Sequence, residues 1–345
     1  MLKTERMDRV RAALRAQGLT QMIVCDPKSV WYLTGVAVEP YERLLALYLP
    51  TEGEPVLFLN RLFNVPEPPC RTVWHTDTDK PVAQIAEVVD AGRPLGIDKE
   101  WPAKFLIPLM ETHPGMQVVL SSDCVDDCRA CKDAEEQALM REASRINDAV
   151  NEAAKHYIKA GMTEREVAEF IDAQFRAHGC EGPSFTTIVS FGANAADPHH
   201  EPDDTMLKEG DCVLFDMGCV KSRYCSDMTR TWFCGQPTEK QAAVHDLVRR
   251  ANEAAEALIK PGVRLCELDA AARDLITEAG YGAYFNHRLG HFIGQTDHEK
   301  GDVSSANRTE VRPGMIFSIE PGVYLPGEFG VRVEDLVLVT ETGCE

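Results

Sequence analysis

The chain has 345 residues, 44% of them hydrophobic and 26% charged, and this length favours two globular domains over one core. Its formal net charge of −19 argues against a nucleic-acid partner, because affinity for phosphate backbones requires basic patches. No apolar run approaches the roughly 18 residues of a membrane span, and no signal-peptide pattern opens the chain. We therefore expect a cytoplasmic protein without a membrane partner.

The first 130 residues predict a small α/β domain. Apolar positions at helical spacing predict a helix over residues 2–18, and a second, shorter helix over 29–33 ends at Gly35. Short apolar runs predict strands at 22–24, 44–49, 55–59, near Val73 and at 95–97. Residues 51–54 join two of these strands into a hairpin. The sequence therefore divides into an N-terminal α/β domain, 1–130, and an α+β domain, 131–345.

Three of the twelve cysteines stand close together before the second domain. Cys124, Cys128 and Cys131 have a spacing that can hold an iron–sulfur cluster. The surrounding stretch, 123–132, is polar and is interpreted as a linker, which would not shield a cluster. Since no signal peptide is present, we expect reduced thiols and no disulfide framework. Iron analysis distinguishes an iron–sulfur site from incidental thiols.

The second domain begins with helical patterns and continues with strands. A helix is predicted from Asp133 to about 160, and a capping box at Thr163 and Glu166 opens another that ends at Gly179. Two more helices are predicted at 239–258 and 265–279. The predicted strands are 185–190, 212–218, 223–233, 315–324 and 331–340, with 212–218 and 223–233 paired antiparallel.

Four acids interrupt these otherwise apolar strands. Asp216, Asp227, Glu320 and Glu334 each stand in or at the end of a strand, where an unpaired carboxylate is costly to bury. Taken alone, each aspartate fits a structural ion pair as well as a metal ligand. His291, flanked by glycines at 290 and 294, is by itself more typical of a structural histidine.

Together, these five residues are hard to pair with one another. Divalent cations would remove the repulsion, and mixed carboxylate and imidazole ligands suit manganese, cobalt, zinc or iron. Bridging carboxylates can hold two such ions about 3.5 Å apart with an acidified water between them. The pattern therefore favours a dinuclear metal site.

The order of the motifs resembles the pita-bread metallopeptidases, and within them the Xaa-Pro branch of prolidase and aminopeptidase P. The resemblance covers nearly the whole chain, including the Trp31–Gly35 segment that is typical of this branch's N-terminal domain. It implies a C-terminal pita-bread, creatinase/aminopeptidase-like domain after a smaller creatinase-type α/β domain. The motifs that carry it are Asp216-x-Gly, Ser226-Asp227-x-Thr-Arg-Thr, Gly290-His291-x-Ile-Gly with His298-Glu299, Ile319-Glu320-Pro-Gly and Gly330-Val-Arg332-Val-Glu334-Asp.

The resemblance also implies roles for the five ligands. Asp216 would chelate one metal ion, while His291 and Glu320 would bind the other. Asp227 and Glu334 would bridge the two. Manganese is the first expectation for both ions, with cobalt, zinc or iron as alternatives. A metal-bridging hydroxide would then attack the amide carbonyl, and Glu320 would be its general base.

Further residues are implied to contact the substrate, a small peptide. His199 matches a family histidine near the scissile bond, and His298 matches one that stabilises the tetrahedral intermediate. Arg332 matches an arginine that supports the ligands or the substrate carboxylate. His200 is interpreted as an exposed neighbour, because the family uses the histidine directly after proline. A homodimer is expected from the resemblance alone.

The resemblance implies an Xaa-Pro dipeptidase, with aminopeptidase P on longer peptides as the alternative. A creatinase-like hydrolase or lyase and a non-catalytic binding module are disfavoured, since all five ligands are retained. A methionine aminopeptidase would not need the first 130 residues. Phe292, the residues 295–297 and the residues 300–302 depart from the family pattern, and we expect them near the substrate, where they affect specificity.

Overall fold

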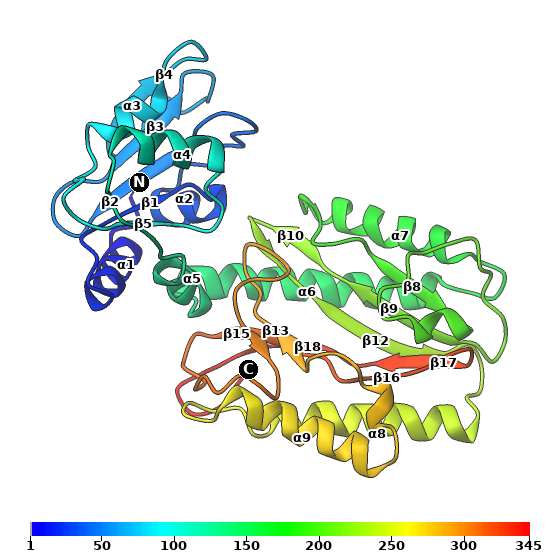
Figure 1. Cartoon of the computed structure of the whole chain (residues 1–345). Helices are drawn as coiled ribbons and strands as arrows, with labels where there is room; N and C mark the ends of the chain where they lie inside the picture. Colours follow the sequence, from blue (N-terminus) through cyan, green and yellow to red (C-terminus); the bar gives the residue numbers. More distant parts are fainter. Residues whose placement is uncertain (1) are drawn as a thin grey trace. The chain divides into compact units, whose positions relative to one another are not determined.

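The computed structural model describes residues 2–345. The chain folds into two compact units, Met1–Cys128 and Arg129–Glu345. Each unit has cores of its own, and each is described separately (Figure 1).

The first unit is built on one mixed sheet of six strands in the order β4-β3-β2-β1-β5-β6. β1 pairs antiparallel with β2 and parallel with β5, and the hairpin predicted over 44–49 and 55–59 is confirmed by the antiparallel pairing of β2 with β3. The strands are β1 (Gln21–Val24), β2 (Ala46–Pro50), β3 (Val56–Asn60), β4 (Arg71–His75), β5 (Leu95–Ile97) and β6 (Val118–Leu120).

The helices of the first unit begin and end where local chemistry allows. Asp26 caps the second helix through Lys28 N and Ser29 N, and Gly35 ends it in a left-handed conformation with φ 73°. Two predicted helices are confirmed by α1 and α2, whereas α3 and α4 were not predicted. The helices are α1 (Thr4–Ala16), α2 (Pro27–Thr34), α3 (Pro81–Ala86), α4 (Ala103–Thr112) and α5 (Asp123–Ala130).

The interpretation of residues 123–132 as a linker is wrong. Most of this stretch forms α5, and Cys124 and Val125 are buried in a core of the first unit. The many acidic residues made the stretch look polar throughout. A short surface helix needs apolar residues on one face only, and Cys124 and Val125 provide that face. The twelve cysteines are thiols without disulfides, as predicted.

The second unit places helices on both sides of its strands. Figure 1 shows α6 and α7 on one side of the long strands β9 and β12, and α8 and α9 on the other. The predicted capping box is confirmed, because Thr163 Oγ1 accepts from Glu166 N and Glu166 accepts from Thr163 N. The helices are α6 (Ala134–Tyr157), α7 (Glu164–Ala177), α8 (Glu239–Glu256) and α9 (Leu265–Glu278), with short 3₁₀ turns η1 (Gly192–Ala196) and η2 (Gly282–Tyr284).

The strands of this unit form several small sheets. β12 pairs antiparallel with β9 as predicted, and β8 lies on the other side of β9. The strands are β7 (Gly182–Pro183), β8 (Ile188–Phe191), β9 (Cys212–Met217), β10 (Cys219–Lys221), β11 (Tyr224–Cys225), β12 (Met228–Phe233), β13 (Gly290–His291), β14 (Asp302–Val303), β15 (Ile316–Ile319), β16 (Gly322–Leu325), β17 (Phe329–Arg332) and β18 (Asp335–Leu338).

Two long predicted strands are each divided in two. The run 315–324 forms β15 and β16, and the run 331–340 is replaced by β17 and β18. β15 pairs with β18 and β16 pairs with β17, so each run changes partner midway. Glu320 and Glu334 stand at these two changes, and the placement of Glu334 within a strand is therefore wrong. Among the described residues, no helix has the length and apolar character to cross a membrane.

Candidate metal centre

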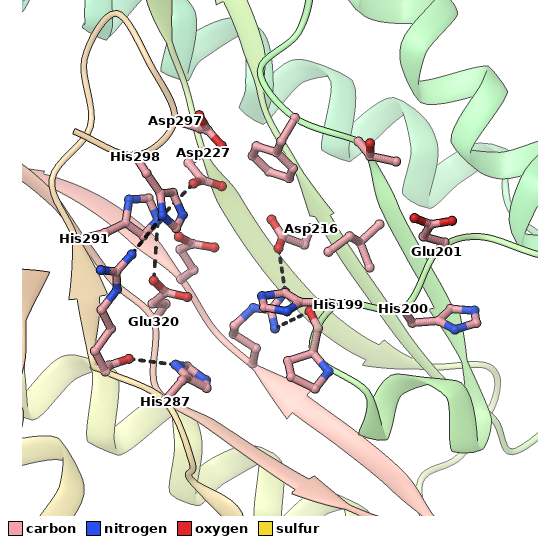
Figure 2. Close-up of a pocket in the computed structure, with 17 residues that line it drawn as sticks. His199, His200, Glu201, Asp216, Asp227, His287, His291, Asp297, His298 and Glu320 are labelled. Atoms are coloured by element: carbon pink, nitrogen blue, oxygen red, sulfur yellow. Dashed lines mark hydrogen bonds and ion pairs between the residues drawn. The ribbon is translucent and has the colours of Figure 1, made fainter. Parts of the chain in front are cut away.

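A cavity of about 470 Å³ opens in the second unit. Its walls contain every residue predicted to bind metal, to act in catalysis or to contact the substrate through a family motif, and Figure 2 shows several of them facing one another. These residues are His199, Asp216, Asp227, His291, His298, Glu320, Arg332 and Glu334.

Strand pairing brings the four acids together. In the β9–β12 ladder, Asp216 lies opposite Thr229, and Asp227 directly precedes β12. In the β15–β18 ladder, Ile319 lies opposite Asp335, which places Glu320 and Glu334 at the same end of that pair. Glu334 joins the two ladders, because its N–H donates to Thr229 O at 3.1 Å and its Oε2 accepts from Thr229 Oγ1 at 2.6 Å.

His291 enters the cluster from β13. Its Nε2 lies 3.4 Å from Asp227 Oδ2 and 3.5 Å from Glu320 Oε1. The N–H of His291 donates to Ser318 Oγ at 3.0 Å, which fixes the strand beside β15. Gly290 makes this approach possible, since a Cβ there would collide with the Ser318 carbonyl oxygen.

Burial and mutual repulsion raise the pKa of three of these carboxylates. Desolvation, followed by repulsion from Asp216 and Glu320, raises the pKa of Asp227 well above its usual value. Desolvation likewise raises the pKa of Glu334, with Asp227 as the next cause, and that of Glu320. Within residues 2–345, Asp216 Oδ1 and Asp227 Oδ1 are buried and accept no hydrogen bond.

The residues present therefore fit a divalent metal site. Asp227, His291 and Glu334 each offer a ligand atom within 4.8 Å of the others. Asp216 and Glu320 face the same cavity, and the mixed oxygen and nitrogen donors suit transition-metal ions. A bound cation would offset the repulsion between the carboxylates. It would also supply a partner for the oxygen of each aspartate that accepts no hydrogen bond.

Arg332 holds one of these acids in place. Its guanidinium donates to Asp216 Oδ2 at 2.5 Å and to Thr229 Oγ1 at 2.9 Å. It also donates to Tyr324 OH at 2.8 Å, and Tyr324 OH lies 2.9 Å from His287 Nε2. His287 and Tyr324 were not predicted, although His287 lies just before the Gly290–His291 motif.

His298 and His199 lie on the open side of the cavity. The His298 ring stacks on His291 with centroids 3.8 Å apart. Desolvation, with repulsion from His291 and Arg288, lowers the pKa of His298 to about 4, so this imidazole is neutral at physiological pH. His199 is exposed, and its N–H donates to Asp197 Oδ1 at 3.0 Å. Both side chains are therefore available to a bound molecule.

The interpretation of His200 as an exposed neighbour is wrong. His200 is half-buried, and its Nε2 lies 2.7 Å from Oε2 of the buried Glu164. Glu164, His200 and Asp203 form a second cluster of possible metal ligands. Glu164, however, already accepts from the N–H groups of Phe191 and Asp203. These hydrogen bonds tie the loop that carries His199 and His200 to the start of α7.

Phe292 does not face the substrate side as expected. It is buried in the core of the second unit, with its ring 5.4 Å from that of Phe317. Of the other residues that depart from the family pattern, 295–297 and 300–302, Asp297 alone lines the cavity. The Phe292 ring packs against Gly301, where a Cβ would lie 2.5 Å from the ring.

The loop that carries His298 is fixed by a buried ion cluster. Glu299 Oε1 lies 2.5 Å from Arg129, and Oε2 lies 3.2 Å from Lys132. Burial alone would raise the pKa of Glu299, but Lys132 and Arg129 outweigh it and hold that pKa at about 2. Glu299 also accepts a hydrogen bond from Gln295 N, so one carboxylate holds residues 295 and 299, on either side of His298.

Comparison with known proteins agrees with this geometry. Residues 138–341 match the model of metallopeptidase family M24, and residues 6–131 match that of the creatinase/prolidase N-terminal domain. An uncharacterized peptidase from Staphylococcus saprophyticus is 38% identical over 349 residues, which cover 99% of this chain and 98% of the relative.

Two solved structures share the whole fold. A prolidase from Thermococcus sibiricus has 33% identity and a TM-score of 0.92, and the match covers 100% of this chain and 96% of the prolidase. The dipeptidase PepE from Mycobacterium ulcerans has 34% identity and a TM-score of 0.93, covering 99% and 94%. The fold class expected from the sequence, a creatinase-type domain before a pita-bread domain, is confirmed. The chain belongs to metallopeptidase family M24 and is a metal-dependent peptidase.

Proposed function

We propose that this peptidase hydrolyses Xaa-Pro dipeptides at a centre that holds two divalent metal ions. The observation that carries the proposal is the convergence of four acids and one histidine in a single cavity. The similarity to a prolidase over the whole chain supports the substrate class. Manganese and a homodimer are proposed on the family resemblance, and a cytoplasmic location and a domain boundary at residue 130 are proposed on the sequence patterns described above.

Each ligand has a proposed place. Asp216 would hold one ion, His291 and Glu320 the other, and Asp227 and Glu334 both. When bound, divalent ions lower the pKa of water and polarise a carbonyl oxygen. Arg332 keeps Asp216 in position through the bond to its Oδ2. The second oxygen of Asp216 accepts no hydrogen bond from the described residues and is left for a metal.

Glu320 is the proposed general base. It stands between β15 and β16 with Oε1 3.1 Å from Ser318 Oγ, which donates to it and fixes its orientation. Burial raises its pKa, so the protonated form is easier to reach than for an exposed glutamate. It can therefore take a proton from the attacking water and deliver it to the leaving nitrogen.

Two histidines complete the proposed machinery. Neutral His298 donates a hydrogen bond to the oxygen on which negative charge develops. His199, exposed at the opposite wall in Figure 2, contacts the peptide near the scissile bond. The nitrogen of an Xaa-Pro bond carries no hydrogen, so a site that delivers a proton to it suits this bond.

Aminopeptidase P activity on longer peptides is the second candidate, supported by the same ligand set. Purified protein loaded with Mn²⁺ should release proline from Ala-Pro and leave Arg-Pro-Pro intact, as followed by chromatography of the products. Turnover of the tripeptide alone would favour the aminopeptidase. Hydrolysis of neither peptide under saturating metal would contradict the proposed substrate class.

A further inference from the structure

The cavity contains far more acids than cations. Six acidic side chains line it, among them Glu201 and Asp297 in addition to the four proposed ligands. Burial, ahead of repulsion from Arg332, lowers the pKa of His287 to about 4, so this histidine adds little positive charge. The permanent cations in its wall are Arg288 and Arg332. An anionic group of a substrate must be received by one of these or by a metal.

Arg332 is already committed to the protein. Its side chain is 4% exposed and donates to Asp216, Thr229 and Tyr324. A further bond reaches Pro198 O at 3.4 Å. Taking Arg332 away from Asp216 would leave a buried carboxylate without its cation, which is strongly unfavourable. Arg332 is therefore a positioning residue and a poor receptor for a substrate carboxylate.

Arg288 is in the opposite situation. Its side chain makes one hydrogen bond, from Nη2 to His298 Nδ1 at 2.8 Å, and no carboxylate lies within salt-bridge distance of it in residues 2–345. Its backbone is anchored, because Arg288 O accepts from His287 Nδ1 at 2.7 Å and Leu289 N donates to Val303 O. The remaining guanidinium N–H groups are thus held at the cavity wall without an anionic partner.

The bond to His298 also fixes the tautomer of that ring. A guanidinium can only donate, so His298 Nδ1 must be the acceptor. A neutral imidazole with an accepting Nδ1 carries its proton on Nε2. Nε2–H is then the donor available to a substrate carbonyl, and Arg288 directly contacts the ring that provides it.

We propose that Arg288 binds the C-terminal carboxylate of the substrate while it orients His298, and so selects dipeptides over longer peptides. This inference rests on the proposed Xaa-Pro function. In an Xaa-Pro dipeptide the carboxylate is attached to the carbon next to the leaving nitrogen. It must therefore lie close to the groups that act on that bond, as Arg288 does. In a longer peptide a neutral amide takes the place of this carboxylate, so the charge-assisted hydrogen bonds to Arg288 are lost.

The test compares Ala-Pro with its amide, Ala-Pro-NH₂, which removes only the negative charge. We expect the wild-type enzyme to prefer the acid in kcat/KM, and Arg288→Gln to lose about ten- to a hundredfold on the acid, with a much smaller loss on the amide. Arg288→Lys, which keeps the charge, should retain part of the preference. Metal content and circular dichroism should match the wild type in both variants.

Matched variants separate the two tasks of Arg288. His298→Ala should slow the acid and the amide by the same factor, because it removes a donor that both substrates use. Arg249→Gln, at a surface arginine paired with Asp246 and Glu253, should change neither. An equal loss on both substrates in Arg288→Gln, or no loss, would overturn the carboxylate assignment.

The wild-type enzyme alone separates this inference from the function on which it rests. Equal cleavage of the acid and the amide overturns the role of Arg288 and leaves the Xaa-Pro activity standing. Cleavage of neither overturns the proposed function, and the inference with it.

Discussion

Replacement of Glu320 by glutamine should lower kcat on Ala-Pro by about a thousandfold, within the range that general-base catalysis supplies. The change keeps the shape of the side chain and its contact with Ser318 Oγ, but removes the group that takes the proton. It also removes one ligand charge from a buried site, so bound metal should decrease. Steady-state kinetics and metal analysis on the same preparation measure both effects.

A distant glutamate supplies the control. Glu328→Gln changes an exposed carboxylate that pairs with Lys240, and we expect activity and metal content like those of the wild type. Full activity of Glu320→Gln at saturating metal would refute the assignment of Glu320 as base. Lost activity that returns completely on adding metal would make Glu320 a ligand only.

Replacement of Asp227 by asparagine should weaken metal binding by more than tenfold, since even changes to groups that merely support ligands cost about ten- to a hundredfold. In the metal-free protein the same change should stabilise the fold. Asp227 is buried beside three other acids, and one of its oxygens has no hydrogen-bond partner among the described residues. Thermal unfolding with and without Mn²⁺ compares the two proteins.

The stabilisation should depend on pH with a definite sign. Burial and neighbouring acids raise the pKa of Asp227 in the folded state above its unfolded value. The contribution of Asp227 to the stability of the metal-free fold is therefore fully present below the pKa of this residue in the unfolded state. It is lost as the pH rises through its pKa in the folded state. The asparagine variant should gain most over the metal-free wild type near pH 8, and the gap should shrink as the pH falls. A metal-free variant less stable than the wild type at every pH would contradict this account.

Much of the site could be predicted because its ligands stand in conspicuous places. An acid in an apolar strand such as 212–217 is visible without a structure, since burial makes it costly. The division of 315–324 had a local signal that was overlooked, because Pro321 cannot donate a ladder hydrogen bond and Gly322 weakens a strand. The division of 331–340 was harder to predict, because β17 and β18 are separated by a change of partner strand, which is a tertiary event.

The site residues that could not be predicted are those that hold or orient other side chains of the site. Glu164 begins α7 as an ordinary member of a capping region, and only the fold shows that it accepts from the loop of His199 and His200. Tyr324 stands in an apolar strand and does not differ from a core aromatic until its bond to Arg332 is known. Arg288 is one of many arginines in the sequence, and only the fold shows that no described residue gives it an anionic partner.

Titration of the metal-free protein with Mn²⁺, with Ala-Pro hydrolysis and bound metal followed together, tests the central claim most directly. We expect no hydrolysis without metal, and activity that reaches its maximum when about two ions are bound per chain. Full activity with a single bound ion, or hydrolysis that persists after complete removal of metal by EDTA, would contradict a dinuclear centre built from Asp216, Asp227, His291, Glu320 and Glu334.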